Sequence, residues 1–240
     1  MITGSATGIG QGISAFFAEQ GANLFLIDRD GSKNEQNAEL LRAKGCRVLT
    51  ATADVRNRTT FEHASKLMLQ EFRKIDILIN NAGIYPRQSF LSMSEQQWDE
   101  MHDINLKSMF HACQAVLPAM MEQQSGKIVN ISSVTFHLGF ANLAHYVSSK
   151  GGIIGLTRAL AREMGPHNVH VNCITPGAVL VEAERAVATE EQLNAILTDQ
   201  SLKRRIMPLD IARVCCFLSS ELSDGMTGQT VNVDGGWVMH

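Results

Sequence analysis

The chain has little of what marks membrane, secreted or nucleic-acid-binding proteins. Its longest aliphatic or aromatic runs, such as residues 24–27, are far too short to span a bilayer. Its 21 basic and 24 acidic residues leave a net charge of −3 and form no basic block, which argues against binding to a polyanion. The first residues lack the basic and apolar regions of a secretory signal. These absences predict a cytoplasmic protein with no membrane and no nucleic-acid partner.

Cysteine is also scarce, and its five copies include no CxxC pair. Their number is odd, and no spacing of histidines and cysteines matches a metal site. We therefore predict reduced thiols that pack as small apolar side chains, and no bound metal.

What the chain does have is an alternation of short apolar runs and longer helix-period segments. Six runs are predicted to be buried strands, at residues 24–28, 47–51, 75–79, 127–132, 170–174 and 230–233. Helices are predicted between them, among them 10–20, 60–72 and 94–121, the last opened by a capping box of Ser94 and Gln97. The alternation predicts one α/β domain over residues 1–240: a doubly wound Rossmann domain whose parallel sheet has about seven strands and helices on both faces. Only Ile2 and Thr3 precede the first glycine, so the first strand is either stunted or begins upstream.

Residues 178–208 interrupt this alternation before the last strand. Thr189 and Gln192 have the spacing of a second capping box, which predicts a short helix there. Ligands of such sheets bind at the carboxyl ends of the strands, and long insertions are usually functional. We interpret the segment as a substrate lid, with an ordinary surface helix as the alternative.

A glycine-rich segment follows the first strand. Gly4, Gly8 and Gly10 permit a tight turn and let a pyrophosphate approach the amides at the start of the next helix. Asp28 comes about 20 residues later, at the end of the next apolar run, where a carboxylate can accept hydrogen bonds from a ribose. A helix cap or turn residue is the alternative interpretation of Asp28.

A second group of residues has acid–base character. Tyr146 and Lys150 are four residues apart and so share one face of a helix. An ammonium beside a phenol favours the phenolate, so we expect the pKa of Tyr146 to be lowered. Ser133 follows the apolar run 128–131, which places its hydroxyl at the carboxyl end of a strand, within reach of a substrate oxygen. A surface Tyr–Lys pair without function is the alternative.

These patterns resemble those of the short-chain dehydrogenase/reductase family, and the resemblance covers essentially the whole chain. The family's TGxxxGxG motif matches residues 3–10, its NNAG motif matches 80–83, and its YxxxK motif matches 146–150. Ser133 lies thirteen residues before the tyrosine, as in the family. Asn105 matches the family's helix asparagine, and residues 176–177 match its Pro-Gly pair.

The resemblance implies a role for each matching residue. Tyr146 is the acid/base at the substrate oxygen, Lys150 holds the nicotinamide ribose, and Ser133 orients the carbonyl or alcohol. Asn105 anchors a water that continues the proton relay to solvent. The residues implied to bind the cofactor are Gly4, Thr7, Gly8, Ile9, Gly10, Asp28, Arg29, Asp54, Val55, Asn81, Ala82, Gly83, Tyr146, Lys150, Pro176, Gly177 and Val179. Val181 stands where the family often has threonine, so a hydroxyl contact to the nicotinamide is expected to be missing or supplied by a neighbour.

The residues at the nucleotide end favour NAD over NADP. The Asp28 carboxylate would repel a 2′-phosphate and accept a hydrogen bond from a 2′-hydroxyl. Thr7 stands where relatives that prefer NADP often carry a basic residue. Arg29 favours NADP instead, because a guanidinium can bind the 2′-phosphate.

We therefore expect a dehydrogenase that moves hydride between NAD and a secondary alcohol or ketone. The loops at 85–90, 134–144 and 179–208 carry polar and aromatic side chains, Glu182 and Glu184 among them, that suit a small polar alcohol such as a sugar or polyol. One alternative is a 3-oxoacyl-thioester (acyl carrier protein) reductase, which usually goes with NADPH and a basic surface for the acidic carrier. The other is a non-catalytic nicotinamide-binding protein.

A homotetramer is expected from the same resemblance. Family members commonly assemble through two long helices and the last strand, matched here by residues 94–121, 146–164 and 230–233. The tail ends in Trp237, Val238 and Met239, apolar residues that need a partner surface. We expect the tail to complete the site of a neighbouring subunit, with packing on its own subunit as the alternative.

Overall fold

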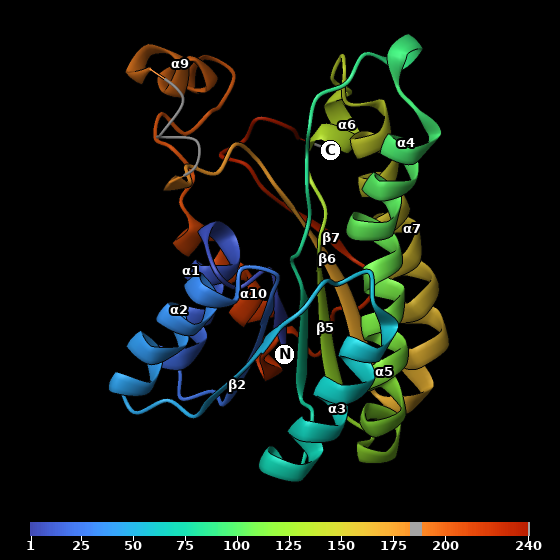
Figure 1. Ribbon diagram of the computed structural model, residues 1–240. Helices are drawn as coiled ribbons and strands as arrows, with labels where there is room; N and C mark the ends of the chain where they lie inside the picture. The colour runs from blue at the N-terminus through green and yellow to red at the C-terminus, as the bar shows by residue number, and fades with distance from the viewer. Residues whose placement is uncertain (183–188, 240) are drawn as a thin grey trace.

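The structure, a computed structural model, describes residues 1–182 and 189–239. Its centre is a sheet of seven parallel strands in the order β3-β2-β1-β4-β5-β6-β7 (Figure 1). The strands are β1 (Ile2–Thr3), β2 (Leu24–Asp28), β3 (Val48–Thr52), β4 (Ile77–Asn80), β5 (Gly126–Ile131), β6 (Val169–Pro176) and β7 (Thr230–Val233). Every apolar run predicted to be a strand overlaps one, with bounds that differ by up to two residues, and the predicted fold class is confirmed.

Helices cover both faces of the sheet, with α1, α2 and α10 on one side and α3, α4, α5 and α7 on the other (Figure 1). The α-helices are α1 (Gly8–Glu19), α2 (Gly31–Ala43), α3 (Arg58–Phe72), α4 (Glu95–His102), α5 (Ser108–Gln123), α6 (Thr135–Leu138), α7 (Ala144–Met164), α9 (Glu190–Ala195) and α10 (Pro208–Leu218). The short helical turns are η1 (Phe90–Ser92), η2 (Asp103–Lys107), η3 (Gly165–His167), η4 (Ile196–Thr198) and η5 (Glu221–Ser223).

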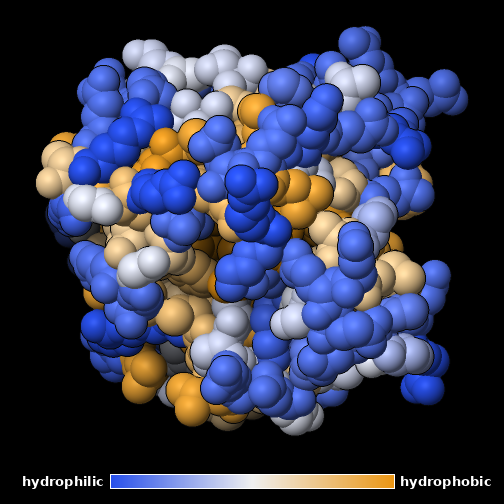
Figure 2. All heavy atoms as spheres, turned by 90° about the horizontal axis from the view of Figure 1, so that it is seen from below, coloured by the Kyte–Doolittle hydropathy of each residue, from blue (hydrophilic) through white to orange (hydrophobic). Residues whose placement is uncertain are grey.

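Two apolar layers join the helices to the sheet, because successive residues of a strand point to opposite faces. Phe25 and Leu78 belong to the layer that packs on α3 and α5. Leu26 and Ile79 belong to the layer that packs on α1 and α10. Both faces of the central strands are thus buried, which explains their continuous apolar runs in the sequence, whereas β3 and β7 at the two edges are partly exposed. Hydrophilic residues cover most of the outer surface seen from below (Figure 2).

Two helical segments differ from the sequence-based prediction. The predicted helix 94–121 does open with its capping box, since Gln97 N donates to Ser94 Oγ at 3.2 Å. It is then divided by the π-helical turn η2 into α4 and α5. The helix α2 was not predicted, because its buried face includes Asn34 and Asn37 and so carries little apolar periodicity.

The five cysteines are all free thiols, and Cys113, Cys173 and Cys215 are buried in the core, as predicted. Burial raises the pKa of Cys113 and that of Cys173 to about 12, so these thiols are unreactive packing groups. Within residues 1–182 and 189–239, no helix is long and apolar enough to cross a membrane.

The order of the strands determines where a ligand can bind. The chain runs outward from β1 to β2 and β3, then returns to place β4 on the other side of β1. The connections on the two sides of this point leave the sheet in opposite directions, so a crevice opens beyond the carboxyl ends of β1 and β4.

Candidate active site

A cleft of about 690 Å³ lies beyond the carboxyl ends of the strands. It is lined by all the residues predicted for cofactor and catalysis except Gly10 and Asn105. Its further lining residues, which the motifs did not indicate, include Ala53, Arg56, Ile84, Glu100, Ile104, Ile131, Ser132, Val134, Thr135, Leu143, Ala178 and Trp237. Among the described residues, no cluster of three or more His, Cys, Asp or Glu side chains could hold a metal ion.

The glycine loop forms the floor of the cleft. Gly4 and Gly8 have φ angles of 65° and 59°, a left-handed conformation that glycine adopts without strain. Gly10 is excluded from the cleft because it packs on the loop itself: a Cβ there would overlap the Gly4 carbonyl oxygen. Thr7, the N-cap of α1, makes no side-chain hydrogen bond to the helix, so the first amides of α1 remain as donors for an anion.

Three polar side chains that the sequence analysis did not single out hold this loop in place. Ser5 donates to Asn34 Oδ1 at 2.8 Å, and Asn37 Nδ2 donates to Ser5 O at 3.0 Å. Both asparagines lie on the buried face of α2, which is why that face is polar. No periodic signal marks such residues, because their contacts are to the glycine loop and not to an apolar core.

Asp28 lies at the end of β2 and lines the cleft. Its Oδ2 accepts from Ala6 N at 2.9 Å and its Oδ1 accepts from Asp30 N at 2.9 Å. The N-cap of α2 is Asp30, whose carboxylate accepts from Lys33 N. The cap of this helix is therefore Asp30 and not Asp28. The carboxylate of Asp28 is oriented at the edge of the glycine loop.

An ion-pair network closes the other side of the nucleotide end. Arg56 donates to Asp54 through Nη2 at 2.6 Å and lies 3.7 Å from Glu100 Oε1 on α4. Hydrogen bonding to Arg56 holds the pKa of Asp54 below its usual value. Asp54 thus stays ionised, and the network links the loop after β3 to α4 beside the cleft.

Ser133, Tyr146 and Lys150, the three residues predicted to act at the substrate oxygen, line the opposite end of the same cleft. Lys150 is buried, and its Nζ donates to Ile131 O at 2.9 Å and lies 5.6 Å from the centre of the Tyr146 ring. Burial lowers the pKa of Lys150 to about 8.

The expectation that Lys150 lowers the pKa of Tyr146 is wrong. Burial raises the pKa of Tyr146, and hydrogen bonding to Ser133 opposes this only in part. The reason is that the phenol loses solvent while Lys150 directs its ammonium to the Ile131 carbonyl. At neutral pH Tyr146 is therefore a protonated phenol that can donate a proton.

Asn105 lies behind the cleft and not in its wall. It belongs to the π-helical turn η2, a feature that often marks functional sites, and it is fully buried. Its Oδ1 accepts from Ile84 N at 2.8 Å, and its Nδ2 donates to Ile84 O at 2.9 Å and to Ser149 Oγ at 3.2 Å. Ser149 in turn donates to Tyr146 O at 2.7 Å. Asn105 thus joins the loop after β4 to the helix that carries Tyr146 and Lys150.

The two ends of the segment predicted to be a lid are hydrogen-bonded to each other. Leu180 N donates to Ile206 O at 2.8 Å, and Val179 pairs with Ile206 in an isolated β-bridge. A short helix, α9, is present where one was predicted. Glu184 and its neighbours at 183–188 lie outside the described residues. Val181 lines the cleft beside Gly8.

The C-terminal tail lies on its own subunit, which was the alternative to completing a neighbour's site. Trp237 lines the cleft and packs edge-on against Phe140, with ring centres 5.9 Å apart and planes at 71°. The tail therefore contributes an aromatic side chain to the site of the same chain.

A glycine loop at the switch point of a parallel sheet, with a Tyr–Lys pair at the other end of the cleft, defines a nicotinamide-dependent oxidoreductase of the Rossmann type. Comparison with known proteins agrees, since the family model for enoyl-(acyl carrier protein) reductase matches residues 4–238. The chain belongs to the short-chain dehydrogenase/reductase family, whose members act on CH–OH or keto groups.

Individual relatives differ in the activity that their names state. A 3-oxoacyl-(acyl-carrier-protein) reductase of Staphylococcus epidermidis is 35% identical over 100% of this chain and 98% of its own length. A Rhizobium meliloti protein named "Probable galactose dehydrogenase" is 36% identical over 98% of this chain and 93% of its own length. A crystal structure from Brucella melitensis, described as a short-chain dehydrogenase/reductase of the glucose/ribitol dehydrogenase type, has a TM-score of 0.91 and 33% identity, covering 99% of this chain and 95% of that one.

Proposed function

We propose that this chain transfers hydride between NAD and the secondary alcohol or ketone carbon of a small polar compound such as a sugar or polyol. The observation that carries the choice of cofactor is Asp28, a carboxylate oriented by two backbone amides at the nucleotide end of the cleft. It accepts hydrogen bonds from the ribose hydroxyls and repels a 2′-phosphate.

Each group of lining residues is assigned to one part of the dinucleotide according to its position in the cleft. The first amides of α1, from Gly8 and Ile9, bind the pyrophosphate beside Gly4 and Thr7. The remaining contacts are made by Asp28 and Arg29 at the adenosine ribose, Asp54 and Val55 at the adenine, Asn81, Ala82 and Gly83 along the centre, and Pro176, Gly177 and Val179 at the nicotinamide. The cofactor supplies the hydride acceptor or donor.

Three side chains manage the proton at the substrate oxygen. Tyr146 as the phenol donates a proton to a carbonyl in the reduction and, as the phenolate formed at higher pH, takes one from an alcohol in the oxidation, and Ser133 holds that oxygen by a hydrogen bond. Lys150 holds the ribose next to the nicotinamide. Asn105 maintains the position of the Tyr146–Lys150 helix through Ser149.

A direct test of the cofactor proposal is Asp28→Ala. We expect weaker NAD binding and a loss of discrimination against NADP, because the repulsive carboxylate is gone. Dissociation constants for both cofactors, measured by fluorescence titration for the unmutated chain and the variant, test this. A preference of the unmutated chain for NADP would contradict the proposal.

A second candidate is reduction of a 3-oxoacyl thioester, and the comparisons support it better than a sugar substrate. Several relatives at 35–36% identity bear that name, from Staphylococcus epidermidis, Staphylococcus aureus and Chlamydia pneumoniae. Turnover of polyols, sugars and an acetoacetyl thioester with NAD, NADH, NADP and NADPH separates the two. The first candidate requires NAD-linked oxidation of polyols or sugars, and the second requires reduction of the thioester as the faster reaction.

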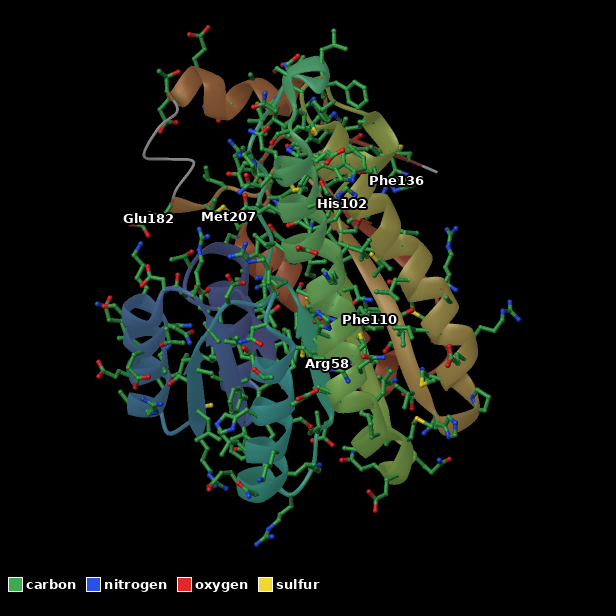
Figure 3. The ribbon with its side chains drawn as sticks, turned by 45° about the vertical axis from the view of Figure 1, so that its right-hand side comes forward. Arg58, His102, Phe110, Phe136, Glu182 and Met207 are labelled. Carbon is green, nitrogen blue, oxygen red and sulfur yellow. The ribbon has the colours of Figure 1, made fainter. Side chains whose placement is uncertain are left out.

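We extend the proposal to a cytoplasmic homotetramer. Its support is an apolar surface on the side of the molecule away from α1, where Phe110 of α5 and Phe136 of α6 are both 43% exposed (Figure 3). Trp98 on α4 is also exposed, and β7 ends the sheet with all of its residues half-buried. An open sheet edge and exposed rings of this kind suit contact with further copies of the chain.

A further inference from the structure

The tail places one indole at the substrate end of the cleft. Trp237 follows β7, which pairs with β6, and the end of β6 carries Pro176 and Gly177 of the nicotinamide region. Gly177 N donates to Val233 O at 3.0 Å, so the two strand ends are in direct contact. Trp237 therefore lies beyond the nicotinamide region, on the side away from Asp28.

A buried carboxylate fixes the position of the indole. Asp234 is 3% exposed, and its two oxygens accept from Gly236 N at 2.9 Å and from Val238 N at 2.8 Å. These amides flank Trp237 on both sides along the chain. Gly235 and Gly236 have φ angles of 72° and 74°, which turn the tail back over the cleft.

The segment after η4 supports the same turn from the other side. Gln200, 1% exposed, donates through Nε2 to Asp234 O at 2.7 Å, and Leu202 N donates to Gly235 O at 2.8 Å. The backbone that carries the indole is therefore held by main-chain and side-chain hydrogen bonds from two segments, and the ring itself packs on Phe140. Such a wall loses little conformational entropy when a ligand packs on it.

The neighbouring rings determine the shape of this part of the cleft. Phe140 stands nearly perpendicular to Trp237, at 71°, so the two rings form an apolar corner. Leu143 and Val134 extend the apolar lining next to it. Tyr85 packs edge-on to Tyr146 with ring centres 6.3 Å apart. Because Tyr85, Tyr146 and the two rings of the corner all line the same cleft, the corner and the acid/base belong to one chamber.

We propose that Trp237 and Phe140 form a subsite for the part of the substrate beyond its reacting carbon, and that this part belongs to a ring whose C–H face packs on the indole. The proposal rests on the proposed function, because it assumes that the substrate carbon reacts at Tyr146. The electron-rich face of an indole attracts C–H groups of a polar ring, while the hydroxyls of that ring remain free for polar partners. A rigid flat wall matches the face of a ring, whereas a linear acyl chain would lose many rotamers on it.

The kinetic test compares substrates that reach Trp237 with one that does not. Galactose and cyclohexanol carry a ring, and propan-2-ol has only the reacting carbon and two methyl groups. For Trp237→Ala we expect kcat/KM to fall about tenfold or more for the ring compounds, because an apolar contact is lost. The value for propan-2-ol and the Kd for NAD should stay unchanged. Met239→Ala, an exposed position in the same tail, is the matched control.

Either of two kinetic results would overturn the subsite. One is an equal loss on propan-2-ol and on the ring compounds, which would make Trp237 a structural residue only. The other is an unchanged kcat/KM for the ring compounds. If the unmutated chain turns over an acetoacetyl thioester and no ring compound, the ring class is wrong while the oxidoreductase function remains.

A binding test by indole fluorescence does not depend on turnover. It is possible because the chain has only two tryptophans, Trp98 and Trp237. The titration is made in chains that also carry Tyr146→Phe, so that galactose and NAD bind without being converted. In Trp98→Phe all indole emission then comes from Trp237, and we expect it to change on titration with galactose in the presence of NAD. The control Trp237→Phe, which keeps Trp98, should show no such change. A response without turnover of any compound by the unmutated chain would refute the proposed function and leave the subsite intact, whereas no response would overturn the subsite.

Discussion

At the scale of single residues, the role of Tyr146 as proton donor is the part of the proposed function that one substitution tests most directly. Tyr146→Phe removes the phenolic hydroxyl and keeps the ring, so we expect NAD affinity to be retained and turnover to fall about 10²–10⁴-fold. Steady-state kinetics together with an NAD titration measure both effects. Tyr85→Phe, at the only other tyrosine, should change turnover far less. Near-normal turnover of Tyr146→Phe would refute the assignment.

The buried ammonium of Lys150 predicts an unusual dependence of stability on pH. Burial lowers the pKa of Lys150 from 10.5 to about 8 in the folded chain. Between these values the unfolded chain binds more protons than the folded chain, so stability rises with pH in that window. Below pH 8, the buried charge costs roughly 3 kcal/mol at ~1.4 kcal/mol per pKa unit.

Lys150→Met should therefore stabilise the cofactor-free chain at pH 7 while weakening its NAD binding. We expect the free energy of unfolding to increase by up to roughly 3 kcal/mol and its rise between pH 8 and 10.5 to disappear. Urea denaturation across this pH range measures both. Lys66→Met, at an exposed position of α3, serves as the control. A less stable Lys150→Met chain with an unchanged pH dependence would contradict this account.

At the scale of elements, the packing of α1 on the glycine loop determines the geometry of the nucleotide end of the cleft. In Gly10→Ala the new Cβ would overlap the Gly4 carbonyl oxygen, so α1 must move away from the loop. We expect a loss of NAD binding and a lower Tm. Gly165→Ala, where nothing lies within 4 Å of an added Cβ, is the matched control and should keep both. Equal behaviour of the two variants in thermal unfolding and NAD titration would refute this role.

At the scale of the whole molecule, the open question is how many copies assemble. Light scattering of the unmutated chain should give four times the chain mass of 26.3 kDa. Phe110→Glu places a charge on the exposed face of α5 and should lower the measured mass, because a buried unpaired charge opposes association. Leu40→Glu, at an exposed apolar position of α2, should leave it unchanged. A stable monomer of the unmutated chain would contradict the proposed tetramer.

The sequence by itself determined the sheet, the position of the glycine loop and the placing of Tyr146 and Lys150 on one helix. Central strands buried on both faces must be continuous apolar runs, so residues 24–28 could be located to the residue. Gly4 and Gly8 were recognisable because only glycine adopts their φ angles without strain. Tyr146 and Lys150 were recognisable because a helix brings residues four apart onto one face.

Only the tertiary structure decided how these groups behave and what surrounds them. The pKa of Tyr146 is raised because its solvent is displaced, which depends on residues far away in the sequence. Asn34 and Asn37 hold the glycine loop, and Asn105 holds the loop after β4, through hydrogen bonds that leave no periodic pattern. Trp237 reaches its own cleft because β7 pairs with β6 and Asp234 turns the tail inward. Local patterns are set by neighbours along the chain, whereas burial and long-range hydrogen bonds exist only once distant segments have packed together.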